Sequence, residues 1–589
     1  MGRQSDPDRA NYNLQIRRTI LTTLEKFSSI ILLIFIFVLP IAMDPIGSFS
    51  ATNAPKYFVI VIGVALLLTL TLSRINFVMI SKSQKSMTFI LIFSLSWSSI
   101  SLFVNRDSLD ERLFGLYGRN LGFITFFSMF LLLWCSLSFL SRWISAFFVS
   151  ISLSALVVAT YFTLQYFGID FGVWEETYGK TPSSSLGNPN YVVALIAIGL
   201  ILSLSLLILQ PRKSFLLNTF NVIILISGIS IMSLADSFQG YLILGVAFAL
   251  LTLFKLFTRY EDKVKKVSKK AVMLFASLLS LGLISGLLAQ GALLRELTSG
   301  SAFARLDYWR ASINMILNSP VFGFGFDSFG NYYTEYRDGS AVIRSAGLFS
   351  DSPHNFLFEL ATFAGLPLAI SYIVIQAQIL RSTRGALKNA SARESFYLFT
   401  LLTYWTGFHI QSLINPSSLA LLSLQFITSG VLFSYSHSVT QEKFLEERSK
   451  NSLKSRKKRE INPSQMLLTL IIGALLIPLS IKFGLAPWEK DRAFKEAATK
   501  GDGAALILIS KDWPFTYSLS ELTALTLLDN QYEELGMQVV RDLVETNPRN
   551  LRGWRLLFDR SKETSERVLA ISKLKELDPL NPEYDQLKP

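Results

Sequence analysis

The sequence has little of the residues on which many soluble and secreted enzymes depend. Its 589 residues include one cysteine, Cys135, and three histidines. A single cysteine excludes a disulfide within the chain and a metal site built from cysteines. Only 17% of the residues are charged, whereas 50% are hydrophobic and 46 are phenylalanines. This composition excludes a disordered or collagen-like chain and an ordinary soluble enzyme.

Several short catalytic and nucleotide-binding motifs are also missing. The sequence contains no phosphate-binding P-loop, no HExxH zinc motif and no GxSxG nucleophile motif. The missing P-loop argues against transport driven by ATP, because that loop cradles the phosphates of the nucleotide.

Long apolar blocks are what the sequence has in abundance. Each is roughly 17 to 25 residues long, which is enough to cross the hydrocarbon core of a bilayer as a helix. Thirteen such blocks begin near Phe27, Tyr57, Met87, Leu121, Trp143, Tyr191, Leu216, Gly240, Ala271, Phe356, Phe396, Leu419 and Met466. The sequence therefore predicts an all-α protein, a polytopic transmembrane helical bundle of about 12 to 13 spans. The first block lacks a small-residue cleavage site, so we expect a retained span.

The position of the charges predicts the topology. The net charge of +13 would suit a nucleic-acid partner if the basic residues were clustered in one soluble region. With the N-terminus in the cytoplasm, however, the cytoplasmic segments hold 30 basic and 10 acidic residues, and the outer loops hold 10 and 14. This asymmetry is the positive-inside rule. We therefore expect a multi-pass protein of the cytoplasmic (inner) membrane, in contact with membrane lipids and with no nucleic-acid partner.

The spans divide the chain into seven parts. They are a cytoplasmic segment 1–26, spans one to nine in 27–288, a large extracytoplasmic loop 289–353, spans ten to twelve in 354–436, a basic cytoplasmic loop 437–464, span thirteen in 465–483 and an extracytoplasmic soluble domain 484–589. In the last part Pro514, Pro548 and Pro579 recur at a period near 34, which resembles tetratricopeptide repeats. A plain helical tail is the alternative. Repeats of this kind form docking surfaces, which predicts a protein partner.

The large outer loop has an ordered pattern. Apolar residues from Ser301 to Asn318 recur at helical spacing, and Asn318-Ser319-Pro320 ends the pattern. An amphipathic helix with Trp309 on its apolar side suits the membrane interface. The aromatic segment Phe322-Gly323-Phe324-Gly325-Phe326 follows it, and we expect that segment to bend and dock onto the bundle.

Two histidines are candidates for chemistry. His354 lies where the loop re-enters the membrane, and Ser352 or Asn355 is placed to cap the helix that follows. The positive end of that helix disfavours an imidazolium, so His354 should be neutral and able to accept a proton. A capping or interfacial histidine is the alternative. His409 lies near the outer end of span eleven, either as a hydrogen-bonded helix contact or as support for an outer site.

Arginines and amides at the outer face are candidates for substrate binding. Arg305 lies one helical turn before Trp309, and a guanidinium binds a diphosphate in a two-pronged way that lysine cannot. Snorkelling toward water is the alternative for each arginine. The other candidates are Arg119, Arg310 and Arg344, the amides Asn188 and Asn190, which otherwise form a turn and a helix cap, and Glu359, which is costly inside span ten unless paired.

Three segments together resemble one family, the O-antigen ligase superfamily, which includes O-antigen polymerases and protein O-oligosaccharyltransferases. These segments are Ser185 to Tyr191, Ala304 to Trp309 with Pro320 to Gly325, and His354 to Leu360 with Gly365. The resemblance covers roughly Phe27 to Tyr435. Some members of the superfamily are similar to this chain also in having a tetratricopeptide-like tail.

This resemblance implies an inverting, metal-independent glycosyltransferase of the GT-C type that needs no cofactor and uses a glycan on undecaprenyl diphosphate. By position, Arg305 matches the family's diphosphate-binding arginine and His354 matches its general base. Asn355 and Trp309 adjoin these residues. Some ligases carry a second essential arginine before the Gly-Asn segment, where this chain has Lys180, and Arg119 is a possible replacement. Lipid A core, a growing polymer, a secreted protein and a wall polymer all remain open as acceptors.

Two alternative functions, neither of them enzymatic, would also place many spans in the membrane. A transporter or glycan flippase should show inverted repeats and charges near the bilayer midplane. The sequence shows no such symmetry, and its notable polar residues gather at one face. A membrane anchor for the helical tail would not require thirteen spans.

Overall fold

A computed structural model describes residues 24–72, 82–105, 108–139, 141–171, 181–210, 214–235, 237–259, 300–344, 347, 349–451 and 463–589. Within these ranges every regular element is a helix, which confirms the all-α prediction. The predicted ninth span near Ala271 lies outside the described residues. So do Lys180, residues 1–23 and most of the basic loop beyond Asn451.

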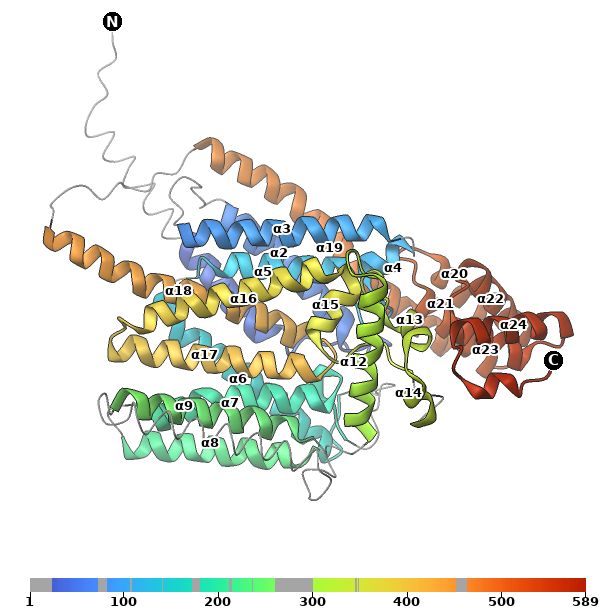
Figure 1. Cartoon of the computed structure of the whole chain (residues 1–589), viewed down its shortest axis with the longest axis horizontal. Helices are drawn as coiled ribbons and strands as arrows, with labels where there is room; N and C mark the ends of the chain where they lie inside the picture. The colour runs from blue at the N-terminus through green and yellow to red at the C-terminus, as the bar shows by residue number, and fades with distance from the viewer. Residues whose placement is uncertain are drawn as a thin grey trace, which may run out of the picture.

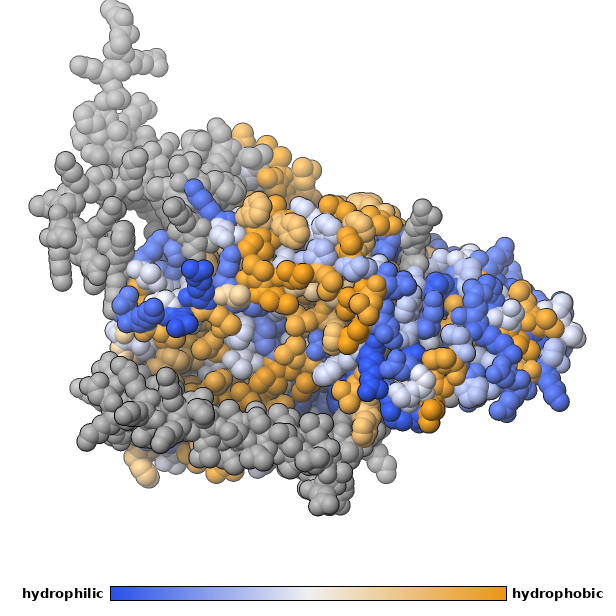
Figure 2. All heavy atoms as spheres, viewed as in Figure 1, coloured by the Kyte–Doolittle hydropathy of each residue, from blue (hydrophilic) through white to orange (hydrophobic). Residues whose placement is uncertain are grey.

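The long helices lie side by side in one bundle (Figure 1). They are α2 (Asn53–Leu72), α3 (Lys82–Val104), α5 (Phe123–Ser136), α6 (Ile144–Tyr166), α7 (Pro189–Leu209), α8 (Phe215–Ser233), α9 (Gln239–Arg259), α16 (Leu366–Leu387), α17 (Ala392–Ile414), α18 (Leu419–Asn451) and α19 (Pro463–Lys500). Residues 24–38 are helical as well. Figure 2 shows apolar side chains over much of the bundle surface and hydrophilic ones over the C-terminal helices.

Eight helices among the described residues are long and apolar enough to cross a membrane. They coincide with the spans predicted near Tyr57, Met87, Trp143, Tyr191, Leu216, Gly240, Leu419 and Met466, so the polytopic prediction is confirmed. The span predicted near Leu121 is shorter than expected. It corresponds to α5, whose 14 residues extend about 21 Å, less than the thickness of the hydrocarbon core.

The prediction that a continuous tenth span begins at Phe356 is wrong. A short helix, α15 (Phe356–Ala364), ends at Gly365, and α16 begins at Leu366. Gly365 has φ +82°, and a Cβ there would lie 1.9 Å from the Val321 carbonyl oxygen, so only glycine fits. Glu359 therefore lies in a nine-residue helix beside the bundle end and not in a span as predicted.

The helix predicted in the large loop is confirmed as α12 (Gly300–Asn318), which crosses the end of the bundle (Figure 1). Its protein-facing side is formed by buried Tyr308, Ala311 and Met315. Leu306 and Leu317, on the predicted apolar side, are instead 44% and 75% exposed. An exposed apolar stripe next to a buried one suits a helix that packs on a bundle and also contacts lipid.

The aromatic segment after α12 docks as predicted. The Phe324 N–H donates to the Thr362 carbonyl at 2.7 Å, and the Gly325 N–H donates to the Phe363 carbonyl at 3.0 Å. The Phe322 ring stacks on Trp97 with centroids 5.4 Å apart. These contacts tie the loop to the end of α15. Two short helices follow, α13 (Phe329–Tyr336) and α14 (Gly339–Arg344).

The C-terminal tail is a row of short helices in which each packs on the next. They are α20 (Gly503–Lys511), α21 (Tyr517–Asp529), α22 (Glu533–Thr546), α23 (Leu551–Arg560), α24 (Thr564–Leu577) and η4 (Pro582–Asp585). Pro514 precedes the pair α21–α22, and Pro548 precedes α23–α24. The predicted domain boundary at 484 falls inside α19, which continues as one helix to Lys500. The tetratricopeptide assignment stays a prediction.

The tail is docked on the loops at one end of the bundle, which we call the tail end. Arg337, after α13, forms a fully buried ion pair with Asp578 of the tail, with Nη2 and Oδ2 2.7 Å apart. The backbone N–H of Tyr117, after α4 (Leu109–Phe114), donates to Ser518 Oγ at 2.7 Å. The Phe515 N–H donates to Asp110 Oδ2 at 2.9 Å. The tail is thereby fixed against the loops that carry the candidate residues.

Candidate functional site

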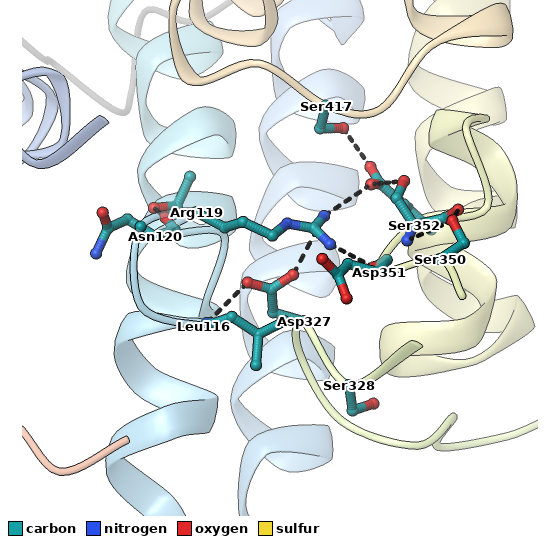
Figure 3. Close-up of polar contacts among 12 residues, drawn as sticks. Leu116, Arg119, Asn120, Asp327, Ser328, Ser350, Asp351, Ser352 and Ser417 are labelled. Carbon is teal, nitrogen blue, oxygen red and sulfur yellow. Dashed lines mark hydrogen bonds and ion pairs between the residues drawn. The ribbon is translucent and has the colours of Figure 1, made fainter. Parts of the chain in front are cut away.

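Arg119 is the centre of a buried polar cluster at the tail end (Figure 3). Its Nη2 lies 3.3 Å from Asp327 Oδ1 and 3.7 Å from Glu359 Oε1, and its Nη1 donates to the carbonyl oxygen of Asp351. The side chains of Asp327 and Glu359 are fully buried, and that of Arg119 is 19% exposed. Arg119 therefore joins Asp327 to the segment from Asp351 to Glu359, although it is more than 200 residues from all of them in the sequence.

The cluster has more acid than base. Two carboxyl groups face one arginine, with Asp351 nearby. Burial raises the pKa of Asp327 to about 6, although Arg119 and the Leu116 N–H, which donates to Asp327 Oδ2 at 2.9 Å, both oppose the rise. A carboxyl group in this state holds a proton for part of the time near neutral pH. Arg119 is thus engaged by protein groups on three sides.

Ser352 connects this cluster to His354. Its hydroxyl donates to Glu359 Oε1 at 2.9 Å and accepts the backbone N–H of His354 at 3.1 Å. Ser417, from the loop before α18, donates to the other oxygen of Glu359. Glu359 is therefore paired, as a carboxylate in so buried a position requires, and it holds the loop that presents the histidine.

The backbone of His354 is in the left-handed region, with φ +54°. Its Nδ1 lies 3.0 Å from the Ser352 carbonyl oxygen. A carbonyl only accepts hydrogen bonds, so Nδ1 carries the proton and Nε2 presents a lone pair. The nearby Asn120 and Asp327 also have positive φ. Such conformations cost about 1–3 kcal/mol each and tend to gather at functional sites.

His354 is neutral at physiological pH. Burial lowers its pKa to about 4, and the positive charges of Arg305 and Arg119 lower it further, whereas the hydrogen bond to the Ser352 carbonyl and the charge of Asp351 oppose the shift. The largest of these causes is burial. The ring packs against Tyr308 of α12 with centroids 5.0 Å apart. A neutral imidazole with an available lone pair can accept a proton from an incoming hydroxyl group.

Arg305 lies in α12, one turn before Tyr308. Its Nε donates to the Ile414 carbonyl at 2.9 Å, and Asn355 Nδ2 donates to the Leu413 carbonyl at 3.1 Å. These carbonyls are at the end of α17, where no helical N–H remains to pair with them. The two side chains tie α12 and the His354 loop to the same helix end. The structure thus brings Arg305, Arg119, His354 and Glu359 together.

The predicted amides have structural contacts. Asn355 caps α15 by accepting the N–H groups of Leu357 and Phe358, so of the two caps considered it is Asn355 that is used. Asn188 caps α7 by accepting the N–H of Asn190 at 2.8 Å, which is the turn-and-cap alternative.

The remaining candidates have partners elsewhere. Arg344 is paired with Asp307, and Arg310 donates to Ser340 at 3.2 Å. Trp309 packs near Phe358 with centroids 6.1 Å apart. His409 bonds the Tyr372 hydroxyl at 2.9 Å and the Trp405 carbonyl at 2.7 Å, as a helix contact would.

Sequence reasoning missed the contacts of four residues at this site, namely Asp327, Asp351, Ser352 and Tyr308, and it considered Ser352 only as a helix cap. Asp327 precedes α13 and looks like an ordinary helix-start residue, so no local pattern identifies it. Asp351 and Ser352 adjoin His354, and proximity to a candidate base was the available signal. Tyr308 was overlooked because it lies beside the more conspicuous Trp309.

Part of the chain matches a known protein family. Residues 192–373 match the family model described as O-antigen ligase. The resemblance to the O-antigen ligase superfamily is confirmed. The O-antigen ligase match contains Arg305, Asp327, His354 and Glu359, whereas Arg119 precedes it and the tail follows it. No curated protein matches the chain.

Proposed function

We propose that this protein is a metal-independent, inverting glycosyltransferase of the GT-C type. It transfers a glycan from undecaprenyl diphosphate to an acceptor hydroxyl at the outer face of the bacterial inner membrane. The observation that carries the proposal is a neutral His354 with an oriented lone pair, set among arginines at one end of an O-antigen ligase-like bundle. A histidine that only caps a helix would need neither an unpaired ring nitrogen nor neighbouring arginines.

The chemistry is a single displacement at the anomeric carbon. The acceptor oxygen forms a bond to that carbon as its proton passes to His354 Nε2, and the bond from carbon to the diphosphate oxygen breaks. The departing diphosphate gains negative charge, which the Arg305 guanidinium stabilises. Attack opposite the leaving group inverts the anomeric configuration. The protonated histidine then releases its proton to water.

Arg119 has a supporting role in this scheme. It is held by Asp327, Glu359 and the Asp351 carbonyl, so it fixes the His354 loop by joining the groups on either side of it. A second phosphate contact from Lys180 stays a proposal drawn from the family resemblance.

Substitution at both central residues tests the proposal. His354→Ala and Arg305→Ala should each abolish transfer of a radiolabelled lipid-linked glycan in membranes while leaving membrane insertion intact. Arg310→Ala is a matched control, because Arg310 is exposed on the same helix and paired with other groups. Near-normal transfer in either central variant would overturn the assignment.

Deletion of the gene identifies the reaction within the superfamily. Accumulated full-length glycan on undecaprenyl diphosphate indicates a ligase, accumulated single repeat units indicate a polymerase, and an unglycosylated secreted protein indicates an oligosaccharyltransferase. Unchanged glycans with loss of a solute uptake would indicate a transporter instead.

A further inference from the structure

A cavity of about 300 Å³ lies between the tail and the loops and short helices at the tail end of the bundle. One wall comes from the loop around Tyr117 and from the segment between Gly330 and Asp351. The opposite wall comes from the tail, including Tyr517, Glu521 and Arg552. Volumes of this size are typical of ligand sites, and such sites are common between domains.

The inner end of the cavity reaches the site described above. Arg119 and Asp351 both line it, and both influence the protonation of His354. Arg119 donates to the backbone carbonyl of Asp351, which is three residues before the histidine. A ligand in the cavity would therefore lie beside the Arg119 cluster that holds the His354 loop, although His354 itself is not part of the lining.

The charges around the cavity balance. The lining has three basic and three acidic side chains, namely Arg119, Arg549, Arg552, Glu111, Asp351 and Glu521. Arg552 Nη1 already donates to Glu521 Oε1 at 3.1 Å, and Arg549 is paired with Glu335. A diphosphate needs arginines in excess, so this cavity suits a neutral ligand better than the donor headgroup.

Two polar groups in the lining are available for hydrogen bonds. The side-chain amide of Asn331 and the carboxylate of Asp351 have no hydrogen-bond partner among the residues that the structure describes. An amide both donates and accepts, and a carboxylate accepts, so together they match vicinal hydroxyl groups. The half-buried rings of Tyr117 and Phe349 lie in the same lining. The Arg552 guanidinium covers one face of Phe349, 4.4 Å from the ring centroid, and an aromatic ring beside polar groups suits the C–H faces and hydroxyls of a sugar.

We infer that this cavity binds a neutral saccharide acceptor, with the C-terminal tail forming its outer wall. The inference rests on the proposed function and names the substrate class for the acceptor side of the reaction. The tail would then contribute residues to the acceptor site itself, in addition to any surface that it offers to a protein partner.

Cysteine labelling in the full-length protein tests the inference. The single native Cys135 is buried, so an introduced cysteine is the reactive one. Asn331→Cys places a thiol in the cavity lining, and Glu534→Cys, on the exposed side of α22, is the matched control. After reaction with a bulky maleimide, transfer by Asn331→Cys should fall about tenfold or more, because the cavity is filled. Labelled Glu534→Cys should be unaffected.

A binding measurement separates the two proposals. Undecaprenyl diphosphate should bind labelled Asn331→Cys as well as it binds the unlabelled protein, whereas Arg305→Ala should lose that binding. Full transfer by labelled Asn331→Cys, with His354→Ala and Arg305→Ala inactive, overturns the cavity assignment and leaves the proposed function standing. Full transfer by His354→Ala overturns the proposed function itself.

The nature of the labelled product tests the class of acceptor. A radiolabelled product that keeps its size after exhaustive protease treatment supports a saccharide acceptor. A product that protease reduces to glycopeptides shows a protein acceptor and overturns this inference.

Discussion

The tail end and the interior of the bundle each hold one half-buried histidine, and the two sites are similar in several ways. His354 and His409 both place Nδ1 near a backbone carbonyl, at 3.0 and 2.7 Å, and both rings pack beside a tyrosine. The difference lies in Nε2. In His409 it bonds the Tyr372 hydroxyl, whereas in His354 it has no hydrogen-bond partner within the described part of the chain.

The surroundings differ too. Arg305, Arg119 and Asp351 act on His354, which sits on a strained loop, while His409 lies in a regular helix among Tyr372 and Trp405. Burial and hydrogen bonding alone therefore do not identify a catalytic histidine. An unoccupied ring nitrogen, nearby charge and an unusual backbone conformation distinguish the two sites.

The largest expected effect comes from replacing each histidine with glutamine. His354→Gln should lower transfer about 10³-fold, because a general base typically contributes 10²- to 10⁴-fold and glutamine has no comparable basicity. His409→Gln should stay within about threefold of the native rate per folded molecule, because only a helix contact changes. Single-turnover transfer from a radiolabelled lipid-linked glycan measures both. Equal losses in the two variants would remove the distinction between the sites.

The next largest difference is expected between substitutions of two arginines in and near α12, Arg305 and Arg344. Arg305→Lys should lower transfer about 30-fold, because lysine keeps the charge but loses the planar fork that holds a diphosphate. Arg344→Lys should have little effect, because Arg344 is bound to Asp307. The apparent affinity for undecaprenyl diphosphate, measured on both purified variants, should fall only for Arg305→Lys. An unchanged affinity in Arg305→Lys would mean that the diphosphate binds elsewhere.

Local patterns explain which parts of this site were predictable. His354 and Arg305 stand out because histidine is rare in this chain and because Arg305 lies on an amphipathic helix whose spacing is visible in the sequence. Glu359 stands out as a charge in an apolar run. Each of these signals is contained in a few consecutive residues.

The rest depends on contacts between distant segments. Arg119 and Asp327 are separated by more than 200 residues, so no spacing rule joins them. The break at Gly365 follows from the close approach of Val321, which the run Ala364-Gly365-Leu366-Pro367 reveals only in part. The docking of the tail depends on the Arg337–Asp578 pair, whose members look like ordinary surface charges in the sequence.

The dependence of transfer on pH provides a smaller test. With a pKa near 4, His354 is neutral above that value, so transfer should be flat between about pH 8 and pH 5 and should halve near pH 4. An ordinary histidine would lose half of its neutral form near pH 6.5. At His354 the unfolded chain binds more protons between pH 6.5 and 4, so this histidine lowers the free energy of unfolding as the pH falls through that window, and the raised pKa of Asp327 opposes that decline.

Protonation of Asp327 could also change the pH profile of transfer, because burial raises the pKa of Asp327 to about 6. The pH profile of Asp327→Asn provides the control. If the native profile has a step near pH 6 and Asp327→Asn lacks it, that step belongs to Asp327. If the step persists in Asp327→Asn, then His354 has an ordinary pKa, and the prediction that its pKa is lowered is contradicted.

The smallest effect is expected in the bundle interior. Tyr372→Phe removes the hydroxyl that joins His409 Nε2 and Gln425 Nε2, at 2.9 and 2.7 Å, while it keeps the ring. Leaving these buried groups without their partner should cost about 1–3 kcal/mol of stability, seen as a lower thermal unfolding midpoint in detergent. Transfer at a permissive temperature should not change, because the hydroxyl lies in a helix contact in the bundle and not at the tail end, where the proposed base lies. A loss of transfer larger than the loss of folded protein would show that the interior histidine contributes to the reaction, and the two sites would then be functionally coupled.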